Sequence, residues 1–99
     1  MPEEFDSKKA GDKPYVLSKV KQDGKLLDFV SEKLKDDEEV AMAAVGQNPI
    51  ALEFVSERLK NNLEIVMESV KKIGWTACYA SPKLQANKNI ILAGVKVDG

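Results

Sequence analysis

Apolar and polar positions along this chain recur with a period of 25 residues. Four valines show the spacing most clearly: Val20, Val45, Val70 and Val95. A glycine or proline, both of which stop helices, follows each valine by four positions. An aromatic residue, a serine and a leucine follow the first three valines at constant distances: Phe29, Phe54 and Tyr79, then Ser31, Ser56 and Ser81, then Leu34, Leu59 and Leu84. A fixed period in this range is typical of stacked repeat proteins, in which each unit buries its apolar face against the next.

The first part of each unit is predicted to form a short amphipathic helix. Its apolar residues follow an i, i+1, i+4 spacing, as in Val16, Leu17 and Val20 of the first unit. The same stripe recurs as Ile91, Leu92 and Val95 in the last unit. A residue whose side chain can accept a free backbone N–H precedes each of the four helices: Asp12, Asp37, Asn62 and Asn87.

A second helix is predicted after a turn in each unit. In the first unit it places Leu27 and Val30 inward, and the next two units place Leu52 with Val55 and Ala77 with Ala80 at the same positions. The repeated serine ends this helix and caps a short extra turn. That turn is expected to carry the repeated leucine into the core.

These patterns predict an all-α fold, a right-handed α-solenoid of three and a half 25-residue helical-hairpin repeats with seven short helices. The repeats are expected at residues 12–36, 37–61 and 62–86, followed by a terminal helix within 87–99. Residues 1–11 are polar apart from Phe5, and they are predicted to form a flexible tail or an arm that becomes ordered on a partner. Helices of about ten residues are marginal alone, so stacking must stabilise them.

Composition removes several classes of site. The formal net charge is −1, and the chain has one cysteine and no histidine. An internal disulfide and the usual zinc sites are therefore excluded, and neither metal nor cofactor is expected. A single cysteine favours a reducing, intracellular and probable cytoplasmic location, with an already cleaved targeting segment left open. The chain has no apolar run of the ~20 residues that a membrane span needs.

The motif that follows the second helix resembles a known family. It reads Val30-Ser31-Glu32-Lys33-Leu34-Lys35-Asp36-Asp37 in the first unit, and it recurs in register from Val55 and more weakly from Ala80, where Ala86-Asn87 replaces the aspartate pair. This pattern is similar to a domain of unknown function, number 4116, found as tandem copies in bacterial and protist proteins. The resemblance implies an all-helical repeat module and carries over no catalytic or ligand-binding residue.

Large apolar residues replace charged or amide residues at several equivalent positions. Trp75 and Ile50 correspond to Lys25 of the first unit, Ile73 to Asp23, and Leu63 to Lys13 and Glu38. We interpret the four as an exposed patch that binds a protein partner, with Trp75 as its anchor. The alternative is that they pack on each other or on the N-terminal arm. This apolar patch consists of Ile50, Leu63, Ile73 and Trp75.

One position stays basic in all three full units, and we call it the basic ladder: Lys33, Arg58 and Lys83. Such a row could follow a nucleic-acid phosphate backbone. Neighbouring Glu32 and Glu57 and the near-zero net charge argue against this alternative. Lysines near helix ends that interact favourably with the helix dipole explain the row equally well.

The sequence therefore predicts a non-catalytic interaction or assembly module, such as a small subunit of a larger complex. No group of carboxylates is placed for acid–base chemistry, so the chain is not expected to be an enzyme. The apolar stripe of the terminal helix has no following hairpin to cover it. Solenoids need polar caps at their ends. Either this helix is itself the cap, or another chain stacks on it, and self-association is one form of that second outcome.

Overall fold

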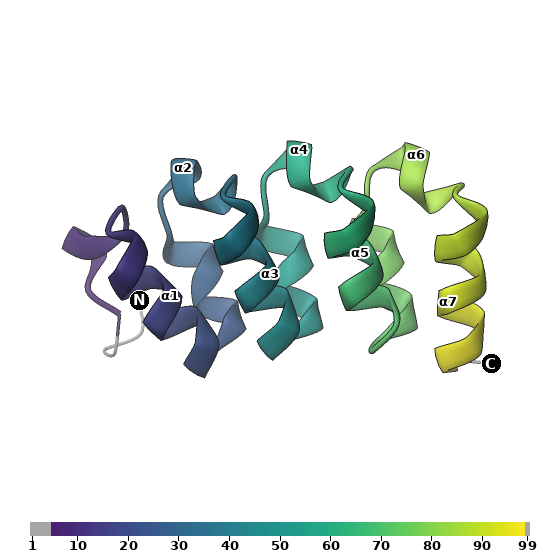
Figure 1. The fold of residues 1–99 in the computed structure, drawn as a ribbon, viewed down its shortest axis with the longest axis horizontal. Helices are drawn as coiled ribbons and strands as arrows, with labels where there is room; N and C mark the ends of the chain where they lie inside the picture. The colour runs from purple at the N-terminus through teal and green to yellow at the C-terminus, as the bar shows by residue number, and fades with distance from the viewer. Residues whose placement is uncertain (1–4, 99) are drawn as a thin grey trace.

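The computed structural model describes residues 5–98 as a row of helical segments (Figure 1). Three types of segment alternate. The four long α-helices are α1 (Lys13–Gln22), α3 (Glu38–Gln47), α5 (Leu63–Val70) and α7 (Lys88–Asp98). The six-residue 3₁₀ helices are η2 (Gly24–Phe29), η3 (Pro49–Phe54) and η4 (Gly74–Tyr79). The shortest segments are η1 (Ser7–Lys9), α2 (Glu32–Lys35), α4 (Glu57–Lys60) and α6 (Pro82–Gln85).

Side-chain caps fix where the long helices begin. Asp12 accepts a hydrogen bond from the Tyr15 N–H, and Asp37 accepts from the N–H groups of Glu39 and Val40. Asn62 accepts from Ile65, and Asn87 accepts from Asn89 and Ile90. The four predicted caps are therefore confirmed. Each satisfies N–H groups that have no partner within the helix.

The second segment of each unit is a 3₁₀ helix, which the sequence pattern did not specify. A 3₁₀ helix has three residues per turn, so positions i and i+3 lie on one face. Leu27 and Val30, and likewise Leu52 and Val55, have this spacing and are buried. Tight packing also shapes the turn before η2, because a side chain at Gly24 would collide with the carbonyl of Ala44. The predicted inward face is confirmed for these residues, whereas Ala77 in η4 is only half-buried.

The short helices α2, α4 and α6 begin at the repeated serines. Each serine hydroxyl accepts from the N–H three residues later, and the leucine at that position is buried in all three units: Leu34, Leu59 and Leu84. The serine N–H groups bind backward across the array, since Ser56 donates to the Lys35 carbonyl and Ser81 donates to the Lys60 carbonyl. One backbone hydrogen bond thus repeats at successive unit boundaries.

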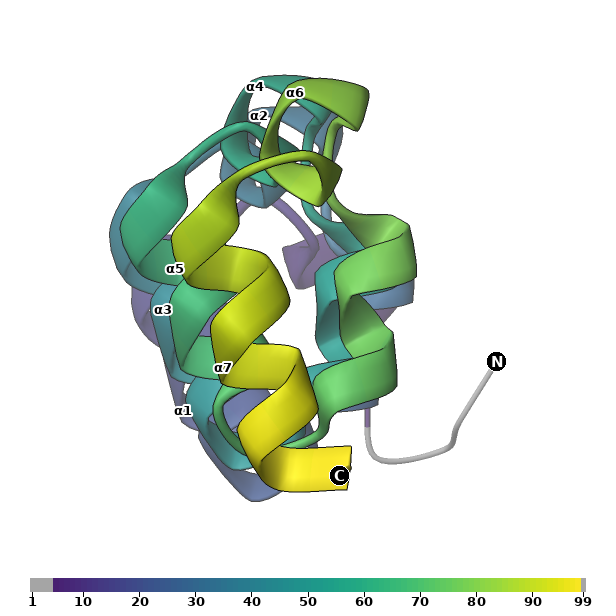
Figure 2. The same cartoon turned by 90° about the vertical axis from the view of Figure 1, so that its right-hand side faces the viewer.

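The long helices form one layer and the 3₁₀ helices form another, with the short helices along one edge (Figures 1 and 2). Neighbours along the chain are neighbours in space: α1 contacts α3, α3 contacts α5, and α5 contacts α7. η2, η3 and η4 contact each other in the same order. The result is an elongated body of 40 × 22 × 19 Å, whose core runs between the two layers.

The sequence predicts seven helices, and residues 5–98 contain eleven helical segments. The difference has two causes. The extra turn after each serine is a separate short helix, and residues 5–11 contain η1. The all-helical class is confirmed. The longest helix in this part of the chain has 11 residues, and no helix within residues 5–98 could cross a lipid bilayer.

Residues 5–11 are folded against the first unit, which differs from the predicted flexible tail over residues 1–11. Phe5 is 3% exposed, and its ring centroid lies 5.6 Å from that of Tyr15 and 6.3 Å from that of Phe29. The Ala10 carbonyl accepts from the Ser31 N–H, as Lys35 and Lys60 accept at the later boundaries. This segment therefore occupies the place of a preceding short helix. Residues 1–4 of the predicted tail lie outside the described residues.

Candidate interaction surface

Trp75 and Ile50 of the apolar patch occupy the same place in two neighbouring 3₁₀ helices. Each is the second residue of its helix, and η3 and η4 are in contact. The Trp75 side chain is 52% exposed, and its ring meets Tyr79 edge-on with 5.9 Å between centroids. Ile50 is half-buried. Exposure of a large aromatic residue is what a partner-binding anchor requires, although it does not identify a partner.

The other two residues of the patch lie at opposite ends of α5. Leu63 is the first residue of that helix and is 41% exposed. Ile73 follows the helix, begins η4 and is half-buried. Eight residues of α-helix separate them by roughly 12 Å along the axis. The structure therefore groups Ile50, Ile73 and Trp75 near the starts of the 3₁₀ helices and leaves Leu63 apart.

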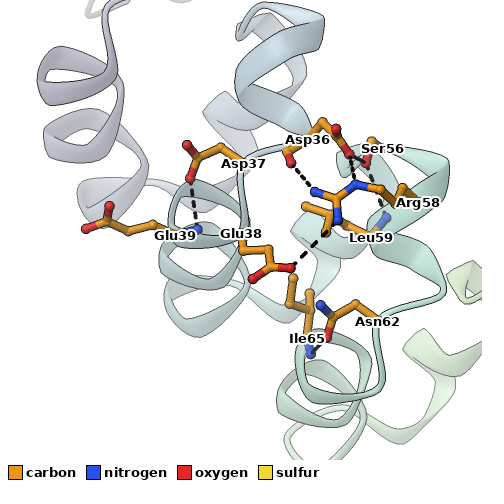
Figure 3. A network of polar contacts seen from close by, with 9 residues as sticks. All are labelled: Asp36, Asp37, Glu38, Glu39, Ser56, Arg58, Leu59, Asn62 and Ile65. Atoms are coloured by element: carbon orange, nitrogen blue, oxygen red, sulfur yellow. Dashed lines mark hydrogen bonds and ion pairs between the residues drawn. The ribbon is translucent and has the colours of Figure 1, made fainter.

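The basic ladder lies on the short helices at one edge of the array, with Lys33 in α2, Arg58 in α4 and Lys83 in α6. All three side chains are exposed. Arg58 is engaged by the preceding unit: its Nε donates to Asp36 Oδ1 at 2.9 Å and its Nη2 donates to the Asp36 carbonyl at 2.8 Å (Figure 3). Glu38 lies 3.7 Å from the same guanidinium. Part of the ladder's charge is thus neutralised within the protein.

Carboxylates at the unit boundaries have lowered pKa values. The Ser56 hydroxyl and the Arg58 guanidinium donate to Asp36 and hold its pKa below the ordinary value. Burial raises the pKa of Asp37, but Lys13 and the N–H groups of Val40 and Glu39 outweigh that effect, so the net shift is downward. Both aspartates therefore stay charged at neutral pH, where they tie neighbouring units together.

The apolar stripe of α7 is the most exposed part of the repeat pattern. Ile91 is 50% exposed, Leu92 47% and Val95 60%. In α1, α3 and α5 the residues equivalent to Ile91 and Val95 are fully buried: Val16 and Val20, Ala41 and Val45, Val66 and Val70. The next unit covers them there. We call Ile91, Leu92 and Val95 the α7 face.

Two grooves run beside α7. One, of about 450 Å³, lies between α5 and α7 and is lined by Met67, Leu92 and Ala93 with Lys71 and Lys96. The other, of about 380 Å³, lies between η4 and α7 and is lined by Gly74, Ala77 and Gln85 together with Ile90, Ile91 and Val95. Both have mainly apolar walls. They are depressions that a docked helix could fill.

A family model described as "Domain of unknown function (DUF4116)" matches the chain three times, at residues 12–60, 37–85 and 62–99. The chain belongs to this family. The three matches begin at residues 12, 37 and 62, which is the 25-residue step of the sequence pattern. No curated protein and no solved structure matches the chain.

Membership of this family adds no reacting group to the site. Within the part of the chain that the structure describes, no three histidine, cysteine, aspartate or glutamate side chains gather closely enough to hold a metal ion. Cys78 is exposed and free. The chemistry that this surface offers is apolar contact with a charged border.

The sequence pattern identified the uncovered stripe of the last helix but did not include Ile91, Leu92 and Val95 among the partner-binding residues. The available signal was the fourth valine of the series, Val95, for which residues 1–99 hold no next unit. The pattern also missed that Phe5 precedes Val30 by one period. That spacing places Phe5 in the core.

Proposed function

We propose that this DUF4116 protein is a non-catalytic protein–protein interaction or assembly module, such as a small subunit bound within a larger complex. The supporting observation is the α7 face. Three adjacent aliphatic side chains are about half exposed there, at positions that are buried or half-buried in the preceding units. Removing such side chains from water contributes roughly 25 cal/mol per Å² of apolar surface, so a matching partner would bind favourably.

The proposal includes the architecture. We infer a right-handed α-solenoid of three and a half hairpin repeats, with residues 87–98 as the half repeat. The 25-residue step and the order in which the helices contact each other support it. In solenoids of this kind each unit contacts only its neighbours, so an end face is built like an internal interface. An end without a polar surface is therefore a natural binding surface.

The apolar patch is a second part of the same proposal. Trp75 and Ile50 would extend the contact along the 3₁₀ layer, and Ile73 lies beside Trp75 in sequence. Leu63, at the other end of α5, would require a partner that reaches across the array. The patch remains a prediction from the sequence, and exposure of Trp75 supports it.

Affinity capture tests the function. The tagged full chain would be compared with Val95→Glu, which places a charge on the α7 face, and with Lys21→Glu, which reverses an exposed charge on α1. The proposal predicts that one or more proteins captured by wild type and by Lys21→Glu are lost with Val95→Glu, while all three chains give the same circular dichroism. Equal capture by all three would contradict it.

Nucleic-acid backbone binding along the basic ladder is the alternative function. The exposure of Lys33 and Lys83 at equivalent positions favours it. The engagement of Arg58 by Asp36 and Glu38 leaves fewer free charges than phosphate contacts need. The protein-binding proposal is therefore the stronger of the two.

A further inference from the structure

The α7 face repeats the surface that α1 presents to the unit after it. Each α-helix of the array packs on the α-helix and the 3₁₀ helix that follow it: α1 contacts α3 and η2, and α3 contacts α5 and η3. These contacts bury Val16 and Val20 completely. Ile91 and Val95 stand at the same positions of α7, with nothing in residues 5–98 covering them. The internal interface therefore shows which shape fits this face.

A repeated hydrogen bond marks the same register. The carbonyls of Ala10, Lys35 and Lys60, spaced by 25 residues, accept from the N–H groups of the serines in the following unit. The next carbonyl in this series belongs to Gln85. Gln85 is exposed, and its carbonyl has no donor among residues 5–98. The boundary beside α7 thus retains the acceptor that the serine of one more unit would use.

Charge adds a third requirement. Lys13, at the start of α1, lies 2.9 Å from the Asp37 carboxylate and 3.0 Å from that of Glu39, both in the next unit. Lys88 stands at the same position of α7, is exposed and has no ion-pair partner within the described chain. An occupant whose long helix begins with acidic residues would pair with Lys88 as Asp37 and Glu39 pair with Lys13.

The opposite end of the array cannot supply this occupant from a second copy. Small residues stand where α3, α5 and α7 approach the preceding helix: Ala44, Ser69 and Gly94. α1 has Lys19 at that position, and its ammonium lies over the Tyr15 ring, 5.6 Å from the centroid. Residues 5–11 also fill the corner that a preceding unit would occupy. The first unit is thus covered by its own polar and aromatic groups.

We propose that the α7 face docks one further unit of the same repeat, carried by a different polypeptide. That unit has a 3₁₀ helix with aliphatic residues, a serine whose N–H meets the Gln85 carbonyl, and a long helix with an acidic first turn facing Lys88. This inference rests on the proposed function and names the class of partner for the same surface.

A synthetic peptide of residues 24–48 is the probe, because this segment contains η2, α2 and α3 and covers α1 within the array. It carries Ser31, Asp37 and Glu39 and has no tryptophan. Binding of the labelled peptide to the full chain would be followed by fluorescence anisotropy. We expect saturable binding that weakens at least tenfold with Val95→Glu and with Lys88→Glu, and is unchanged with Lys21→Glu.

A charge exchange makes the test specific. A peptide with Asp37→Lys and Glu39→Lys should bind Lys88→Glu more tightly than it binds wild type. Absence of saturable binding at millimolar peptide, or binding that Val95→Glu leaves unchanged, would overturn the inference. So would a wild-type dimer in light scattering that Val95→Glu abolishes, since a second copy would then be the occupant.

The two proposals fail in distinguishable ways. If the peptide does not bind but affinity capture still depends on Val95, the partner has another chemistry and only this inference is lost. If capture is also independent of Val95, the proposed function is lost with it.

Discussion

The Lys13 ammonium lies 2.9 Å from the Asp37 carboxylate, which joins the first turn of α1 to the first turn of α3. Asp37 also caps α3 through the N–H groups of Glu39 and Val40. One side chain therefore has two roles, an ion pair between units and a cap within its own. The two roles can be separated, because asparagine caps helices as well as aspartate does but carries no charge.

Replacing Asp37 by alanine should cost about 1 kcal/mol of unfolding free energy, the usual value for a lost cap. Asp37→Asn should cost less, because it removes only a partly exposed ion pair. Urea unfolding of the two variants and wild type measures both effects. Equal losses for alanine and asparagine would show that the charge, and not the cap, stabilises this boundary.

Stability should fall in acid. The pKa values of Asp36 and Glu68 are lowered by hydrogen bonds, to Asp36 from Ser56 and Arg58 and to Glu68 from Lys71 and Lys72. A carboxyl group whose pKa is lower in the folded state adds stability above its unfolded pKa and loses it as the pH falls through the folded value. The unfolded values are 3.8 for aspartate and 4.5 for glutamate. We therefore expect the loss below about pH 4.5.

Thermal unfolding between pH 7 and pH 2 checks this expectation. Asp36→Asn should give a shallower decline than wild type, because one of the linked carboxyl groups is gone. Glu32→Gln is the matched control, since Glu32 is an exposed carboxylate for which no shift is expected to matter at this boundary. A pH profile for Asp36→Asn that parallels wild type would contradict the assignment of Asp36.

Ser69 and Thr76 form a buried polar pair between α5 and η4. Their hydroxyl oxygens lie 2.6 Å apart, and Ser69 Oγ lies 2.8 Å from the Pro49 carbonyl of the preceding unit. The second unit has Ala44 and Ala51 at these positions, both fully buried. An apolar pair is therefore compatible with the fold.

Ser69→Ala alone should cost about 1 kcal/mol or more, because it leaves buried polar groups with fewer partners. The double variant Ser69→Ala/Thr76→Ala should cost less than the sum of the two single changes. A double-mutant cycle in urea measures the coupling. Strict additivity would show that the two hydroxyls do not act as a pair.

Trp75→Glu should leave the helical circular dichroism intact and abolish capture of a partner that binds the 3₁₀ layer. Half of the Trp75 side chain is already in water, so its replacement should not unfold the protein. Lys25→Glu is the matched control at the equivalent position of η2. If Trp75→Glu unfolds the chain, Trp75 belongs to the core and the apolar patch is not a binding surface.

The basic ladder gives the test of the alternative function. If this chain binds RNA or DNA, binding should weaken with salt and should fall when Lys33, Arg58 and Lys83 are all changed to glutamine. Arg58→Lys keeps the charge and loses the forked hydrogen bonds to Asp36, so it separates stability from charge. Undiminished binding by the triple variant would remove this hypothesis.

Much of the fold follows from the sequence because the repeat places a capping residue before every long helix. The residues Asp12, Asp37, Asn62 and Asn87 gave the starts of these helices, and the serines gave the starts of the short ones. The 3₁₀ form of the second helix was not predictable from the periodicity, because Leu27 and Val30 are spaced by three residues, which also suits an α-helix. Packing against neighbouring units decides between the two.

The site was less predictable than the fold. Trp75 was recognised because charged Lys25 occupies its position in the first unit. Leu63 was grouped with it from the same comparison, although α5 separates the two in space. The order of residues 5–11 was missed because Lys8 and Lys9 hide the register of Phe5, and its burial depends on contacts with Tyr15 and Phe29. Contacts between units are not encoded in the pattern of any single unit.

Site-specific photo-crosslinking tests the central claim, that the α7 face binds another protein. A photoreactive residue would replace Val95 on this face in one sample and Lys21 on α1 in another, and the cross-linked products would be resolved by mass. The account predicts a discrete adduct with another polypeptide from position 95 and none from position 21. No adduct from position 95, or the same adducts from both positions, would contradict it.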